Sequence, residues 1–154
     1  MDKLTQIADG VFVAGQIAPE EVPGLAAQGI RTIVNNRPDG EEPGQPSAEE
    51  VRHEATQAGM IYQQIPVTTG SITADDVAAM DRAIRTGVKP ILAHCRSGTR
   101  SYLLWAAAQL THGGGDGGGA GLSAEEIVAR GAAQGFDLSA LPMIVAKIGG
   151  GHRG

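Results

Sequence analysis

Aromatic residues are scarce in this chain of 154 residues, where phenylalanine, tryptophan and tyrosine together make up 3%. Hydrophobic residues still account for 42%, so we expect a core built from alanine, valine, isoleucine and leucine. A chain of this length favours one folded domain with a core of its own. We therefore predict a single domain over residues 1–154.

Cysteine is almost absent as well. Cys95 is the only one in the chain, which excludes an internal disulfide and fits a reducing compartment. No apolar run reaches the roughly 18 residues that would span a membrane. The N-terminal sequence MDKLTQIADG lacks the apolar core of a signal peptide. We therefore expect a cytoplasmic protein that does not contact a membrane.

Basic residues are outnumbered by acidic ones, which gives a net charge of −5 and a sequence pI near 5.3. This balance excludes nucleic-acid binding over a broad basic face. A small basic pocket remains compatible with it. We expect neither a metal ion nor another cofactor.

Short apolar runs alternate with helical patterns along the chain. Strands are predicted over residues 11–15, 31–36, 60–67 and 89–95. Helices are predicted over residues 19–29, 47–59, 73–87, 99–112, 123–135 and 137–150. Three of these helices begin with a capping box, namely Ser47 with Glu50, Thr73 with Asp76, and Ser123 with Glu126. This rhythm predicts an α/β fold with a mostly parallel sheet flanked by helices.

Glycine is concentrated near the C-terminal third. The segment GGGDGGGAG at 113–121 is predicted to be a flexible linker between two helices. It has neither the preceding strand nor the following lysine of a phosphate-binding loop. We also predict a short disordered tail at 149–154.

The chemistry of the chain is concentrated in the segment AHCRSGTRS at 93–101. It joins a predicted strand to a predicted helix, so Cys95 lies at the carboxyl edge of the sheet, where open α/β sheets bind ligands. Backbone N–H groups and the helix N-terminus favour an anion there. They also favour a thiolate at Cys95 at neutral pH. Gly98 permits a left-handed turn in the loop.

Arg100 offers a planar fork that matches two oxygens of one anion. The other predicted site residues of the loop are the catalytic Ser101, whose hydroxyl can bond the sulfur, and the anion-binding residues His94, Arg96, Ser97, Gly98 and Thr99. The alternative interpretation of Cys95 is a buried structural thiol. For His94, it is a partly buried histidine with satisfied hydrogen bonds, and for Arg96 a side chain that points to solvent.

Three further loops should converge on the same edge of the sheet. NNRPDGEEPGQPS at 35–47 brings Arg37 as a second cation and Asp39 as a catalytic carboxylate, unless it is a solvated connection. TTGSIT at 68–73 brings hydroxyl groups, and GQI at 15–17 brings Gln16.

Four segments together resemble one family of small bacterial domains, the phosphatase-like domain of beta-lactamase-hydrolase-like proteins. They are VAGQIAPEEV, TIVNNRPDGEEPGQPS, YQQIPV and LAHCRSGTRS, and the resemblance covers roughly residues 4–112. It implies a dual-specificity-phosphatase-like fold. In some relatives such a domain is fused to a sulfur dioxygenase, which implies a place in sulfide and persulfide handling.

The spacing inside the loop departs from that of cysteine-dependent phosphatases. Those enzymes place five residues between cysteine and arginine, whereas four separate Cys95 from Arg100. The active loop of single-domain rhodaneses, which are sulfurtransferases, has the shorter spacing. The loop CRSGTRS therefore resembles both classes of enzyme.

A general acid would distinguish the two chemistries, because expelling an alkoxide or phenoxide gains ~10²–10⁴-fold from one. Dual-specificity phosphatases carry that acid as an aspartate on the loop where this chain has Thr68 to Ser71. Asp39 is the one candidate substitute, whereas sulfite leaves thiosulfate without a proton. The sequence therefore favours transfer of sulfane sulfur through a Cys95 persulfide, from a small anionic substrate such as thiosulfate or a persulfide to a thiol acceptor. The alternatives are a phosphomonoester hydrolase and a non-catalytic anion- or persulfide-binding module.

Overall fold

The computed structural model describes residues 4–112 and 122–153. Its centre is a five-stranded sheet in the order β1-β2-β5-β3-β4. The strands are β1 (Thr5–Ala8), β2 (Val11–Ala14), β3 (Thr32–Asn35), β4 (Ile61–Gln64) and β5 (Ile91–His94). β2, β5, β3 and β4 run parallel, and β1 pairs antiparallel with β2. The prediction of an α/β fold with a mostly parallel sheet is confirmed.

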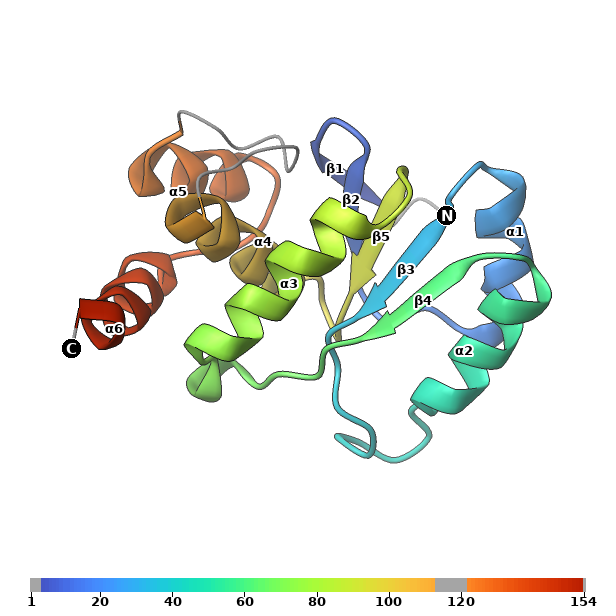
Figure 1. Cartoon of the computed structure of the whole chain (residues 1–154). Coiled ribbons are helices and arrows are strands. Elements are labelled where there is room, and N and C mark those ends of the chain that lie inside the picture. Colours follow the sequence, from blue (N-terminus) through green and yellow to red (C-terminus); the bar gives the residue numbers. More distant parts are fainter. Residues whose placement is uncertain (1–3, 113–121, 154) are drawn as a thin grey trace.

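Helices cover both faces of this sheet (Figure 1). One face packs against α1 (Val22–Ala27) and α2 (Ala48–Gln57). A 3-10 turn, η1 (Pro19–Glu21), immediately precedes α1. The other face packs against α3 (Ala74–Thr86), α4 (Thr99–His112), α5 (Ala124–Ala133) and α6 (Leu141–Arg153). A second 3-10 turn, η2 (Thr69–Ser71), precedes α3.

Side chains that alternate along the strands divide the core into two clusters, one on each face of the sheet. Ile33 and Leu92 face the α1–α2 side, whereas Val34 and Ala93 face the α3–α6 side. Successive side chains of a strand point to opposite faces, which is why both faces of these short strands are apolar. α4 packs against α3, α5 and α6, and its residues from Ser101 to Gln109 are all buried.

The capping boxes at Ser47, Thr73 and Ser123 form as predicted. The structure differs from the sequence prediction at β1, at β4 and at the first helix. β1 was not predicted, because its four residues contain a single buried apolar side chain, Ile7. β4 is shorter than 60–67, and the first helix is divided into η1 and α1.

Within the predicted disordered tail at 149–154, residues 149–153 form the end of α6, and residue 154 lies outside the described residues. The predicted flexible linker at 113–121 lies outside the described residues. In the part of the chain that is described, no helix is long and apolar enough to cross a membrane.

Candidate active site

The cysteine loop lies where the sequence predicts it, between the central strand β5 and the buried helix α4. β2 and β3 flank β5, so the loops that follow these strands meet at the same edge of the sheet. The backbone N–H of Gln16 donates to the carbonyl of Arg96 at 3.1 Å, and that of Asn36 donates to the carbonyl of His94 at 2.8 Å. Two neighbouring loops are thereby hydrogen-bonded to the segment around Cys95.

Cys95 has no exposed surface, and its sulfur accepts a hydrogen bond from the backbone N–H of Gly98 at 3.1 Å. This donor immediately precedes α4, so the sulfur lies at the N-terminus of that helix. Gly98 has φ +97°, and a Cβ there would lie 2.9 Å from the Phe136 ring and 3.4 Å from the Ala14 carbonyl. Only glycine fits this conformation and space together.

Arg100 directs its fork at a carboxylate that belongs to the protein itself. Its Nη1 and Nη2 atoms each lie 2.8 Å from an oxygen of Glu41, and Nη1 also donates to the Val67 carbonyl at 2.9 Å. The hydrogen bonds from Arg100 to Glu41, together with one from Arg37, lower the pKa of the Glu41 carboxyl to about 2. The Glu41 carboxylate therefore occupies the position at Arg100 where the sequence predicts a substrate anion.

Arg37, the second cation that the sequence predicts for the site, lies near Arg100 with its side chain only 2% exposed. Its three nitrogens donate to three different residues: Nε to Glu41 at 2.8 Å, Nη2 to Glu42 at 3.0 Å, and Nη1 to Gln16 at 3.1 Å. Those bonds to Glu41 and Glu42 raise the pKa of the guanidinium against the opposing effect of burial.

Arg96 is the exposed cation of the loop, with 67% of its side chain accessible and Nη2 lying 3.9 Å from Glu42. Arg37, Glu41, Glu42, Arg96 and Arg100 together line a cavity of about 310 Å³. Ser97 and Thr99 are joined by a hydroxyl–hydroxyl hydrogen bond of 3.2 Å. Of the predicted anion-binding residues, Arg37 and Arg96 thus line this cavity, whereas His94, Ser97, Gly98 and Thr99 are not among its lining residues.

Ser101 differs from its prediction. Its buried hydroxyl donates to Oδ1 of Asn36 at 2.7 Å, so that proton is not directed at the Cys95 sulfur. The Asn36 amide in turn donates to the Ile65 carbonyl at 3.0 Å. Ser101 therefore joins α4 to the segment after β3 in this structure.

His94 is completely buried at the end of β5. Its ring nitrogens have no hydrogen-bond partner among the described residues. Burial lowers the pKa of His94 to about 4, so the ring is neutral at physiological pH. It lies beside Cys95 as an uncharged group, and it contributes no positive charge to the site.

Asp39 is not brought to the cysteine loop. Its Oδ1 accepts a hydrogen bond from the backbone N–H of Ala48 at 2.7 Å, at the N-terminus of α2. It lines a different cavity together with Tyr62 and Gln64. The carboxylates that do lie at the site are Glu41 and Glu42, which the sequence interpretation missed although they belong to the same loop.

The sequence matches the family described as "Beta-lactamase hydrolase-like protein, phosphatase-like domain" over residues 3–112. The chain belongs to this family. Its curated relatives include Beta-lactamase hydrolase-like proteins from Xylella fastidiosa (strain Temecula1), 38% identical over 136 residues, and from Agrobacterium fabrum (strain C58), 36% identical over 138 residues. These alignments cover 88% and 90% of the chain but 30% of either relative, so the chain corresponds to less than a third of those proteins.

Solved structures of cysteine phosphatases share the fold of this phosphatase-like domain. A Neisseria meningitidis Z2491 protein, provisionally described as a phosphatase, superimposes with a TM-score of 0.76 at 30% identity, covering 94% of this chain and 96% of that one. The catalytic core of Siw14, a PP-IP phosphatase from S. cerevisiae, gives a TM-score of 0.65 at 15% identity, covering 93% and 85%. The second similarity concerns the fold alone.

Proposed function

We propose that this protein is a cysteine-dependent phosphomonoesterase with Cys95 as its nucleophile. One observation carries the proposal: the Cys95 sulfur accepts a hydrogen bond from the N–H of Gly98, which immediately precedes α4 and lies two residues before Arg100. This places the sulfur of a candidate nucleophile beside a group that can bind two oxygens of an anion. Membership of a phosphatase-like family and the fold of its structural neighbours support the same reaction.

The reaction has two steps on this sulfur. The Cys95 thiolate forms an S–P bond as the ester P–O bond breaks, and the alkoxide or phenoxide departs and takes up a proton from solvent water. Water then attacks phosphorus, the S–P bond breaks and inorganic phosphate leaves. Arg100 and the loop N–H groups stabilise the charge on the phosphoryl oxygens in both steps. Glu41 must first release Arg100, since its carboxylate holds the fork in the structure.

This proposal reverses the order of the two sequence-based interpretations. Sulfane-sulfur transfer becomes the second candidate, and it retains one supporting observation. Asp39 is bonded to the N-terminus of α2, so it does not supply a proton to a departing alkoxide from that position. Sulfite departing from thiosulfate needs no such proton. A binding module without turnover is the remaining alternative.

Turnover of an aryl phosphate series tests the proposal. The wild type should hydrolyse aryl phosphates and the Cys95→Ser variant should not, while both give the same circular dichroism spectrum. Incubation with thiosulfate or glutathione persulfide, followed by intact mass measurement, runs in parallel. A stable gain of one sulfur atom with no aryl phosphate hydrolysis would replace phosphatase with sulfur transfer. A fully active serine variant would remove Cys95 from the mechanism.

A further inference from the structure

Two carboxylates share one edge of the Arg37 guanidinium. Nε of Arg37 donates to Glu41 and Nη2 donates to Glu42, at 2.8 and 3.0 Å. These two nitrogens form a single planar fork that usually takes both oxygens of one anion. Here the fork is divided between two anionic groups instead. The oxygens of Glu41 and Glu42 that bind Arg37 are therefore neighbours in the cavity.

Each of the two carboxylates also lies near a second arginine. Glu41 is bound by both terminal nitrogens of Arg100 at 2.8 Å. Glu42 lies 3.9 Å from Nη2 of Arg96. The cavity therefore contains two adjacent anion positions, one between Arg100 and Arg37 and the other between Arg37 and Arg96.

The first of these positions is the one that the proposed reaction requires. A phosphoryl group must bind the Arg100 fork to reach Cys95, so it must displace the Glu41 carboxylate. Glu42 follows Glu41 directly in the chain, and a movement of the loop that withdraws one carboxylate also displaces the other. Both anion positions then become vacant together.

A single phosphoryl group in the position of Glu41 uses two oxygens to replace the bonds to Arg100 and to Nε of Arg37. In the proposed reaction its third oxygen faces the N–H groups of the cysteine loop. Such a binding mode would leave Nη2 of Arg37 without its partner, on a side chain that is only 2% exposed. A buried cation that loses its partner is costly. The arrangement therefore favours a ligand that carries two anionic groups side by side.

We propose that the substrate carries a second phosphoryl group next to the one that is cleaved, and that this second group binds between Arg37 and Arg96 in the position of Glu42. The proposal rests on the function above, in that it assigns the position at Arg100 to the scissile group. Glu41 and Glu42 then occupy the two anion positions in the absence of substrate. Two adjacent phosphoryl groups replace both carboxylates, whereas a single phosphoryl group replaces only Glu41.

Calorimetric titration of the Cys95→Ser variant tests this without any turnover. The probes are methylenediphosphonate, which has two adjacent phosphonate groups that resist hydrolysis, and inorganic phosphate. Diphosphonate should bind at least about tenfold more tightly, as expected for an added charge-assisted contact. Glu42→Gln should increase that preference, because it weakens the internal competitor. Arg96→Gln should reduce the preference and leave the affinity for phosphate nearly unchanged.

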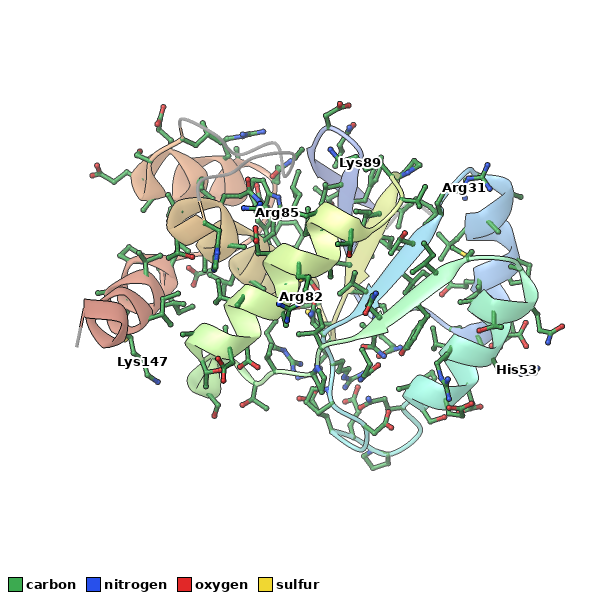
Figure 2. The ribbon with its side chains drawn as sticks, in the orientation of Figure 1. Arg31, His53, Arg82, Arg85, Lys89 and Lys147 are labelled. Atoms are coloured by element: carbon green, nitrogen blue, oxygen red, sulfur yellow. The ribbon has the colours of Figure 1, made fainter. Side chains whose placement is uncertain are left out.

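Arg31→Gln is the matched control. This exposed arginine lies at the amino end of β3, at the opposite edge of the sheet from the cysteine loop (Figure 2). It makes the same change in net charge without touching the cavity, and it should leave both affinities unchanged. Equal affinities for the two probes would overturn the double-anion proposal alone, because aryl phosphate turnover by the wild type tests the phosphatase separately. Failure of both probes to bind would overturn it as well.

Discussion

At the scale of single residues, Arg100 and Arg37 have different roles although one carboxylate binds both. Arg100 lies on the first turn of α4, after Cys95 in the chain, and its two terminal nitrogens bind Glu41. Arg37 is buried and holds Gln16, Glu41 and Glu42 in place through three separate bonds. Fork geometry therefore matters most at Arg100, whereas a charge with several donors in fixed directions matters at Arg37.

Arg100→Lys should reduce kcat/KM for aryl phosphates by on the order of 10²-fold, because lysine keeps the charge and loses the two-pronged contact. Steady-state kinetics measures the loss. Arg82→Lys, at an exposed position on α3, is the control and should behave as the wild type. Kinetics close to wild type for the Arg100 variant would show that this arginine does not bind the phosphoryl group.

Gly98→Ala should inactivate the protein and destabilise it. The change combines an unfavourable φ of +97° with a Cβ only 2.9 Å from Phe136, and it displaces the N–H that bonds Cys95. Gly29→Ala is a matched control, because Gly29 has φ +99° and open space around its Cβ position. Both variants should lose about 1–2 kcal/mol from the backbone conformation, measured by urea unfolding.

The Gly98 variant should lose additional stability and its activity, whereas the Gly29 variant should keep full activity. Equal losses of stability together with unchanged turnover would mean that the loop tolerates a side chain at residue 98. The bond between its N–H and the sulfur would then be dispensable.

At the scale of elements, the segment between β3 and α2 is held by internal hydrogen bonds, although its residues 39–44 are exposed. Gln45 accepts a hydrogen bond from the N–H of Glu41 at 3.0 Å and donates to the Pro38 carbonyl at 2.8 Å. Asp39 binds the N-terminus of α2 from the same loop. These bonds direct Glu41 and Glu42 towards the cysteine loop and keep Asp39 away from it.

Asp39→Ala should lower the free energy of unfolding by about 1 kcal/mol, as expected for loss of a helix N-terminal acceptor. It should leave unchanged the dependence of the hydrolysis rate on the pKa of the leaving phenol. Ser47→Ala removes the side-chain cap of the same helix and serves as the comparison. A selective loss of activity on phenols of high pKa, in the Asp39 variant alone, would identify Asp39 as the general acid.

Regular elements were largely predictable because their signals are periodic or local. Capping boxes fixed the starts of α2, α3 and α5, and apolar runs located β2, β3 and β5. Cys95 and Arg100 were recognisable because a strand end and a helix start place them together. Glu41 and Glu42 were missed because an irregular loop has no period from which the direction of a side chain can be deduced. Their signal was composition alone: two acidic residues four and five positions after a site arginine.

At the scale of the whole molecule, the site forms where the sheet and its two helical layers end. Glu41 occupies the fork of Arg100, and Cys95 has no exposed surface. The proposed reaction therefore requires movement of Glu41, which belongs to the loop between β3 and α2. The sheet and α4 form the fixed part of the site, because α4 is buried along most of its length.

Buried and paired groups also make the stability of the whole fold depend on pH. His94 has its pKa lowered from 6.5 to about 4 by burial, and Glu41 has its pKa lowered from 4.5 to about 2 by hydrogen bonds from Arg100 and Arg37. In both cases the unfolded chain binds a proton at a higher pH than the folded one. Stability therefore falls as pH falls, from 6.5 to about 4 for His94 and from 4.5 to about 2 for Glu41.

His94 should dominate the upper part of this range. Its shift corresponds to a loss of about 3 kcal/mol in the free energy of unfolding between pH 7 and pH 4, at 1.36 kcal/mol for each pH unit. Urea unfolding at a series of pH values measures this slope. His94→Gln removes the titrating group and should flatten the curve above pH 4, even if its stability at pH 7 is lower. His53→Gln, at an exposed position on α2, should retain the wild-type slope. An unchanged slope in the His94 variant would show that the ring is protonated in the folded protein as readily as in the unfolded chain. His94 would then contribute a positive charge next to Cys95.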